Sequence, residues 1–192
     1  QNIEVFSLDQ LATNPKARPL IDRLTRNLKE ADGMSTVTTK LKDAVNILTA
    51  YKRLAWVVPC SISNSPQGSS DHPFREDSNE LKIGYLGGVA PYQNLEELVL
   101  PFLNALIQKD SRIKVLLITH QPKAMEKLIR PFSWAENKIE MVSVPQSRVH
   151  SYLQSLDLGL MIRKRNLVNE VAQPVKIGEY LAAGVPVLLQ SQ

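Results

Sequence analysis

The sequence has a single cysteine and no long apolar run. Cys60 cannot form a disulfide within the chain, so nothing in the composition requires an oxidising compartment. No apolar stretch approaches the roughly 18 residues that span a bilayer. The first residues, Gln1 to Phe6, lack the basic start and apolar core of a signal peptide. These absences predict a cytoplasmic protein, and peripheral association with the inner face of a membrane stays open.

Charge of one sign is also scarce. The 23 basic and 19 acidic residues give a net charge of +4, and the densest basic cluster, Arg163 to Arg165, is too short for a nucleic-acid footprint. No two of the three histidines are spaced as metal ligands on one helix face, and the sequence contains no P-loop or nucleophile elbow. We therefore expect no nucleic-acid partner, no metal and no cofactor, while the positive balance suits an anionic ligand such as a nucleotide diphosphate.

From residue 81 onward, short apolar runs alternate with longer amphipathic segments. The runs predict strands over residues 81–86, 113–119, 139–144, 158–162 and 186–189, and the intervening segments predict helices over residues 94–108, 122–132, 147–156 and 175–183. Val115 to Ile118 are apolar throughout, as expected where helices cover both faces of a parallel sheet. The pattern predicts an α/β fold with a Rossmann-like, doubly wound parallel sheet; a buried helix of equal length is the alternative for each run.

The first 62 residues show a shorter version of the same pattern. Helices are expected over residues 17–30 and 41–49, and strands over residues 34–38 and 54–58, which are too few to close a sheet. Residues 63–80 are rich in polar and turn-forming residues, which is typical of a linker. We therefore predict one domain in residues 1–62, a linker, and a second domain in residues 81–192. Because the chain does not begin with Met and stops beside an apolar run, we expect an excised piece, truncated at its C-terminus.

The strongest local feature is the segment from Pro174 to Val187. Pro174 can open a helix, whose first-turn N–H groups have no partners and suit phosphate oxygens. Lys176 lies in that turn, and Glu179 lies one turn further along, where its carboxylate could accept hydrogen bonds from a sugar diol. The alternative is a plain amphipathic helix with Lys176 and Glu179 in water.

This segment has the order P-x-K-x-x-E-Y-L-A-x-G-x-P-V and resembles the signature of the retaining glycosyltransferases of the large GT4 family, which have the GT-B fold. Residues 83–88 resemble the first strand and glycine turn of that family's donor domain. Residues 31–41 resemble the last strand and helix of its acceptor domain, and residues 57–62 resemble the segment that leads out of it. Four matches in the right order are more specific than any one alone.

The resemblance implies two Rossmann-like domains and a metal-independent transfer of a hexose from a nucleotide sugar, UDP-linked, to a glycan, lipid or protein acceptor. Glu179 would hold the ribose hydroxyls, and the Gly87–Gly88 turn would let the backbone approach the phosphates. Val144 and Pro145 would lie near the base. The helix start, formed by Pro174, Val175 and Lys176, would lie against the diphosphate and the donor sugar. For the glycines alone, a tight turn without a ligand is the alternative.

Two departures from the family pattern affect the predicted site. The family has two glutamates eight positions apart. In this sequence the residue eight positions before Glu179 is Val171, and the nearest glutamate, Glu170, lies one position earlier. Residues 89–100 contain no Lys or Arg, where many members carry a basic pair, so Arg163 and Lys164, after the fourth strand, are the predicted replacements. Their alternative is a solvated basic loop.

The predicted catalytic residues are Glu170 and Lys176. A non-catalytic nucleotide-sugar-binding domain, or another GT-B enzyme such as an epimerase, remains the alternative to a transferase.

Overall fold

The computed structural model describes Pro15, Ala50 and residues 18–48, 54–62, 79–134, 137–163 and 167–190. The chain divides into two compact units. The first is made of residues 1–61 and 164–174, and the second of residues 62–163 and 175–192. Most of the predicted linker, residues 63–78, lies outside the described residues.

The second unit is built on a five-stranded parallel sheet with the strand order β5-β4-β3-β6-β7. The strands are β3 (Leu81–Leu86), β4 (Ile113–Ile118), β5 (Ile139–Val142), β6 (Leu158–Met161) and β7 (Val187–Leu189). All five were predicted from their apolar runs, and the three strands β4, β5 and β6 end one or two residues earlier than expected. The Rossmann-like α/β prediction is confirmed.

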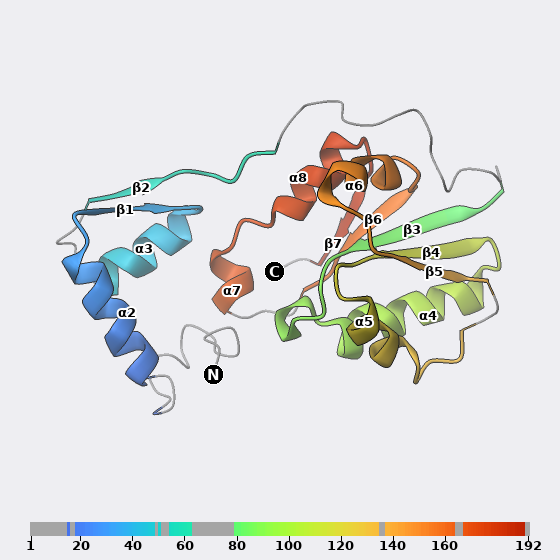
Figure 1. Ribbon diagram of the computed structural model, residues 1–192, viewed down its shortest axis with the longest axis horizontal. Coiled ribbons are helices and arrows are strands. Elements are labelled where there is room, and N and C mark those ends of the chain that lie inside the picture. Colours follow the sequence, from blue (N-terminus) through green and yellow to red (C-terminus); the bar gives the residue numbers. More distant parts are fainter. Residues whose placement is uncertain are drawn as a thin grey trace. The chain divides into compact units, whose positions relative to one another are not determined.

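Helices cover both faces of this sheet (Figure 1). On one face, α4 (Leu100–Lys109) and α5 (Pro122–Ile129) pack through Leu103 and Met125. On the other, α6 (Gln146–Leu153) and α8 (Val175–Ala182) pack through Leu153 and Tyr180. Because successive residues of a strand point to opposite faces, burying both faces requires the continuous apolar runs seen in the sequence.

Tyr180 fixes α8 against the sheet. A Cβ added to Gly159 in β6 would lie 2.5 Å from the Tyr180 ring, so only glycine lets the ring approach this closely. The buried Tyr180 hydroxyl donates to the carbonyl of Gly84 at 3.2 Å and accepts from the N–H of Leu86 at 2.8 Å. The helix ends at Gly184, whose φ of 75° confirms the predicted left-handed stop. These contacts of Tyr180 fix α8 against β3 and β6.

The segment after β3 differs from the single helix predicted over residues 94–108. A 3-10 turn, η2 (Pro91–Gln93), is followed by Asn94 in the left-handed conformation and by a π-helix, η3 (Leu95–Val99), which continues into α4. Pro101 lacks an N–H and cannot donate to the carbonyl of Glu97 as an α-helix requires. Directly before Pro101 the helix widens to a π turn. In this turn the N–H of Val99 donates to the carbonyl of Asn94, five residues earlier.

The first unit contains α2 (Arg18–Glu30), β1 (Gly33–Thr36), α3 (Thr39–Leu48), β2 (Leu54–Val57) and α7 (Leu167–Val171). The strands β1 and β2 are parallel neighbours. The four earlier elements match their predictions to within two residues, whereas α7 was not predicted, because five residues are too few to show a helical period.

The segment of residues 167–174 is fixed to the first unit by two hydrogen bonds. The Thr38 hydroxyl donates to the Val171 carbonyl at 2.6 Å, and the Cys60 N–H donates to Gln173 Oε1 at 2.7 Å. The sequence had placed these residues in the second domain.

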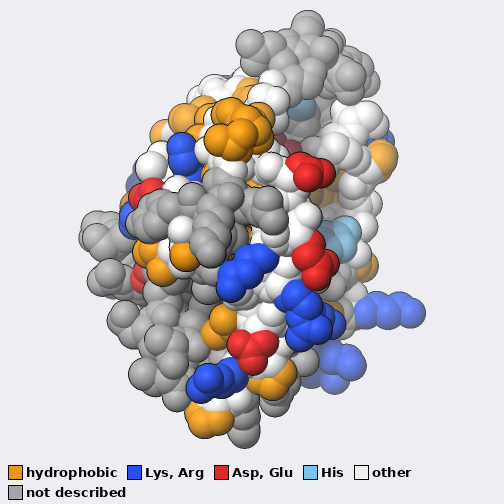
Figure 2. Space-filling view, turned by 90° about the vertical axis from the view of Figure 1, so that its left-hand side faces the viewer, with side chains coloured by type: hydrophobic (Ala, Val, Ile, Leu, Met, Phe, Trp, Pro, Cys, Tyr) orange, Lys and Arg blue, Asp and Glu red, His pale blue; other side chains and the backbone are white. Residues whose placement is uncertain are grey.

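Apolar side chains remain exposed on this unit. Leu54, Trp56 and Val58 alternate along β2 and its extension and are each more than half exposed. Figure 2 shows hydrophobic side chains beside charged ones on the face that it draws.

Candidate functional site

The glycine turn after β3 is the centre of the candidate site. A Cβ added to Gly87 would lie 2.6 Å from Lys176 Nζ and 2.7 Å from the Tyr85 hydroxyl oxygen. A Cβ added to Gly88 would lie 2.6 Å from Gln121 Oε1. A side chain at either position would displace one of these groups. The fold therefore brings Lys176 directly against the predicted glycine turn, at the carboxyl edge of the sheet where open α/β folds bind ligands.

The backbone of this turn is held by internal hydrogen bonds. The N–H of Gly87 donates to the Ile118 carbonyl at 3.0 Å, and the N–H of Val89 donates to Gln121 Oε1 at 3.0 Å. The buried Tyr85 hydroxyl donates to the Gly88 carbonyl at 2.8 Å. Because the N–H groups of Gly87 and Val89 already have partners, the turn is a stiff platform, and these two groups are not available to an anion.

Lys176 is the first cation of the candidate site. It is the second residue of α8 and is largely buried. Its pKa is lowered from 10.5 to about 8, chiefly because burial penalises the charged form and also because Arg163 is close; Glu179 acts in the opposite direction. A bound anion beside Lys176 would favour its charged form, so the position is suited to phosphate oxygens.

Arg163 is the second. It lies two residues after the end of β6, and its guanidinium carbon is 5.5 Å from the centre of the Tyr92 ring in η2. Burial lowers the pKa of Arg163, and the neighbouring Tyr92 and Tyr85 act in the opposite direction. The positive charge of Arg163 also contributes to the lowered pKa of Lys176, the other cation of the predicted phosphate-binding set.

Glu179 occupies the other end of the candidate site. Gln146, the first residue of α6, donates from Nε2 to Glu179 Oε1 at 2.7 Å. The predicted base-binding residues Val144 and Pro145 directly precede Gln146, and Pro145 is the N-cap of α6. The start of α6 and the middle of α8 therefore meet at the predicted diol-binding carboxylate. Sequence reasoning missed Gln146, although it directly follows the predicted base segment.

Two further residues at this edge were missed. Gln121 and His120 follow β4, and His120 Cε1 would lie 3.2 Å from a Cβ added to Gly88. His120 is exposed, and its place beside the glycine turn could not be read from the sequence, because β3 and β4 are brought together only by sheet pairing.

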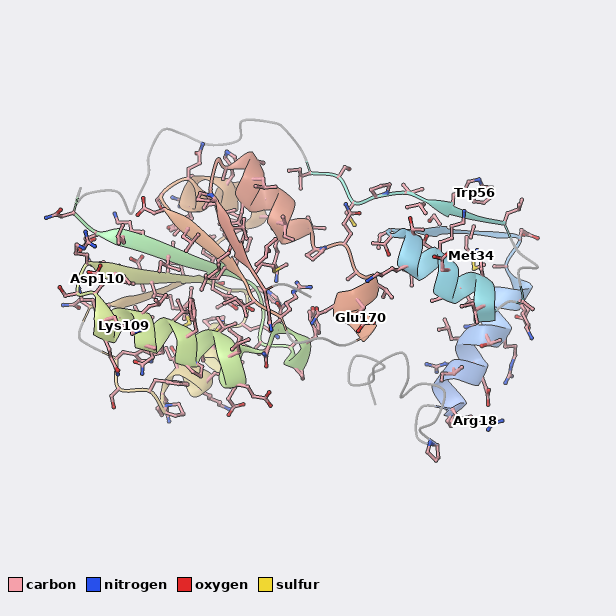
Figure 3. All side chains as sticks on the ribbon, turned by 180° about the vertical axis from the view of Figure 1, so that it is seen from behind. Arg18, Met34, Trp56, Lys109, Asp110 and Glu170 are labelled. Atoms are coloured by element: carbon pink, nitrogen blue, oxygen red, sulfur yellow. The ribbon has the colours of Figure 1, made fainter. Side chains whose placement is uncertain are left out.

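The remaining predicted residues are Glu170, Pro174, Val175 and Lys164. Glu170 is on α7, and Figure 3 labels it there; α7 and Pro174 belong to the first unit. Val175 begins α8, directly after Pro174, and its side chain is exposed. Lys164 lies outside the described residues.

Neither a metal cluster nor a membrane-spanning helix occurs in the described part of the chain. No group of three or more His, Cys, Asp and Glu side chains is arranged there to hold a metal ion. None of the described helices is long and apolar enough to cross a membrane.

No protein-family model matches the sequence, and no curated protein matches it. Solved structures do match. A mutant of TarM from S. aureus, in complex with fondaparinux, alpha-GlcNAc-glycerol and UDP, has a TM-score of 0.64 at 12% identity over 91% of this chain. An alpha,alpha-trehalose-phosphate synthase (UDP-forming) from Burkholderia vietnamiensis has a TM-score of 0.64 at 12% identity over 95%. WaaG, a glycosyltransferase involved in lipopolysaccharide biosynthesis, has a TM-score of 0.66 at 14% identity over 95%.

The fold is that of GT-B glycosyltransferases. The matched region covers 32% of the TarM chain, 49% of the synthase and 50% of WaaG. The chain thus spans half or less of the length of the structures that it resembles, and at these identities the likeness is one of fold.

Proposed function

We propose that the second unit binds the nucleotide sugar of a glycosyltransferase that transfers a hexose to a glycan, lipid or protein acceptor without a metal. One observation carries this proposal: Lys176 Nζ lies against the Gly87 turn, and Glu179 lies one turn further along α8, while the charge of Arg163 contributes to the lowered pKa of Lys176. Two partly buried cations suit a diphosphate, and a carboxylate at this distance along the helix suits the ribose diol.

The two cations would act mainly in the reaction itself. Transfer of a hexose leaves a nucleoside diphosphate, whose negative charge develops as the glycosidic bond breaks. Fixed cations in a partly desolvated site stabilise that charge more strongly than water does. Lys176 and Arg163 would supply this stabilisation, together with the first-turn N–H groups of α8.

Known structures with this fold support the choice of a UDP-linked donor. The TarM mutant was solved with UDP, the pneumococcal O-GlcNAc transferase GtfA was solved with UDP and GlcNAc, and the Burkholderia enzyme is a UDP-forming synthase. Membership of the GT4 family, a retaining outcome and a role in polysaccharide assembly are parts of the same proposal. So are the catalytic role of Glu170 and the phosphate contacts of Pro174 and Lys164.

The second candidate is a domain that binds a nucleotide sugar without turning it over. Two observations favour it: Val171 stands at the position of the family's first glutamate, and residues 89–100 contain no Lys or Arg. Both candidates use the same donor site and differ in whether the sugar is transferred.

Calorimetric titration of the chain with UDP, GDP and ADP tests the donor site. We expect one nucleotide to bind saturably and Glu179→Ala to weaken it by about tenfold, the loss expected for a hydrogen bond to a charged group. Lys138→Ala is the matched control, because Lys138 precedes β5 at the opposite edge of the sheet. A folded chain that binds none of the three nucleotides would contradict the proposal. Where a nucleotide binds, an assay for release of UDP from a UDP-hexose distinguishes the two candidate functions. Release would indicate a transferase, and binding without release would indicate a non-catalytic domain.

A further inference from the structure

The positive charge at the glycine turn comes from a different part of the chain than in the family that the sequence resembles. Residues 89–100 supply no cation, and the first turn of η3 instead carries Glu96 and Glu97, both exposed. Two carboxylates at a helix start would repel a phosphate there. A cation that binds phosphate beside η2 and η3 therefore has to come from another element. Arg163, which follows the end of β6, lies beside the Tyr92 ring of η2.

A long side chain that comes from a neighbouring strand needs support to hold its charge in one place. An arginine side chain loses rotamer freedom when its guanidinium is fixed, so a contact that holds the guanidinium beforehand favours ligand binding. Arg163 has a platform: its guanidinium carbon lies 5.5 Å from the centre of the Tyr92 ring. That distance lies within the range over which an aromatic face attracts a cation.

Tyr92 is itself held firmly. It is the middle residue of η2, and the turn is closed by the N–H of Gln93 on the Ala90 carbonyl at 2.9 Å and by the N–H of Asn94 on the Pro91 carbonyl at 3.1 Å. Pro91 fixes the backbone at the start of the turn. The η2 turn follows the glycine turn directly, so it places the ring beside the site where the diphosphate would lie.

We propose that Tyr92 is a positioning residue for donor binding, which holds the Arg163 guanidinium in place for the diphosphate. This inference rests on the proposed donor site and adds a residue to it. The ring contributes its face, so Phe can replace it and an aliphatic residue cannot. The nucleoside monophosphate, which has no second phosphate, gains little from the arrangement.

The test compares UDP with UMP on four forms of the full chain: wild type, Tyr92→Leu, Tyr92→Phe and Arg163→Met. We expect Tyr92→Leu to weaken UDP binding roughly 5- to 30-fold, the range of a cation–π contact between exposed and desolvated settings. UMP affinity should change less than twofold, and Tyr92→Phe should keep the wild-type UDP affinity.

The double variant Tyr92→Leu/Arg163→Met completes the test. If Tyr92 acts through Arg163, the double variant loses no more UDP affinity than Arg163→Met alone. Additive losses, an equal loss of UMP binding, or failure of Tyr92→Phe to restore UDP binding would overturn the inference. A wild-type chain that binds no nucleotide would instead contradict the proposed function, so the two failures are distinguishable.

Discussion

The two ends of the five-stranded sheet differ in how their charged side chains are arranged. At the amino ends, cations are paired with carboxylates: Lys114 Nζ lies 2.5 Å from Glu80 Oε1, and Arg112 lies 2.6 Å from Asp110, at the end of α4 (Figure 3). At the carboxyl ends, the pKa values of Lys176 and Arg163 are both lowered, chiefly by burial, and the charge of Arg163 adds to the shift of Lys176.

The pKa shifts at the two ends have opposite meanings. Hydrogen bonds from Arg112 lower the pKa of Asp110 to about 2, so the folded chain favours the charged form. Burial and Arg163 lower the pKa of Lys176 to about 8, so the folded chain disfavours the charged form. The paired end has little to gain from a ligand, whereas the carboxyl end would be stabilised by an anion. Shifted pKa values of the second kind are typical of functional sites.

The largest expected effect comes from removing a cation at the carboxyl end. We expect Lys176→Met to weaken UDP binding about 30-fold, because a charge-assisted hydrogen bond in a partly buried site is lost. Lys114→Met is the matched control at the amino end and should change UDP affinity less than twofold. The measurement is calorimetric titration of both variants. Equal effects of the two substitutions would mean that the comparison between the ends has no bearing on binding.

The pH dependence of binding is the next largest effect. A bound diphosphate should raise the pKa of Lys176 from about 8 towards its ordinary value, so the complex would take up a proton above pH 8. UDP affinity should therefore be constant just below pH 8 and then fall by up to about tenfold per pH unit above it. Lys176→Arg should remove this fall, because arginine stays charged. A wild-type affinity that is level from pH 7.5 to pH 9.5 would contradict the prediction.

The same shift has a consequence for the ligand-free chain. The folded pKa of Lys176 lies below the unfolded value of 10.5, so the unfolded chain binds more protons between pH 8 and pH 10.5. Lys176 therefore adds to the free energy of unfolding as pH rises through that window, and this contribution is lost as pH falls to 8. Lys176→Met should flatten this part of the stability profile in urea titrations.

The strands of the sheet could be predicted from the sequence because burial on both faces requires an uninterrupted run of apolar residues. Val115 to Ile118 are apolar without interruption, and Gly184 ends α8 where a left-handed residue is needed. The sequence-based prediction failed where a single residue or a contact with a distant residue determines the local backbone conformation. Pro101 imposes the π turn η3, and α7 is too short to show a period.

The candidate site was predicted only in part for a similar reason. Lys176 and Glu179 share one helix, so their spacing is visible in the sequence. Gln146 meets Glu179, and Arg163 meets Tyr92, only after the parallel strands have aligned their carboxyl ends. The spacing of a motif within one helix can be read from a sequence. Contacts between side chains of different elements depend on the order of the strands, which was not predicted from the sequence.

Removing Gln146 should have a smaller effect at the carboxyl end. Its Nε2 holds one oxygen of the Glu179 carboxylate at 2.7 Å, which leaves the other oxygen for a diol. We expect Gln146→Ala to weaken UDP binding about fivefold, because an exposed hydrogen bond that orients a carboxylate contributes less than a buried charge. Gln154→Ala, at the opposite end of α6, is the control. Since the loss should depend on the diol, it should be absent with the 2′,3′-dideoxy nucleotide; an equal loss with that ligand would exclude this role.

The smallest effect is expected at the paired end. Asp110→Asn removes the carboxylate partner of Arg112, which is exposed and screened by water, so the thermal midpoint at pH 7 should fall by at most about 3 °C. Because the folded pKa of Asp110 is about 2 and lies below its ordinary 3.8, the stabilisation is present above pH 3.8 and is lost as pH falls to about 2. The difference between wild type and variant should disappear over that window, and UDP affinity should not change. A change in UDP affinity would show that the two ends of the sheet are coupled, and the contrast between a paired end and a ligand-binding end would then have to be abandoned.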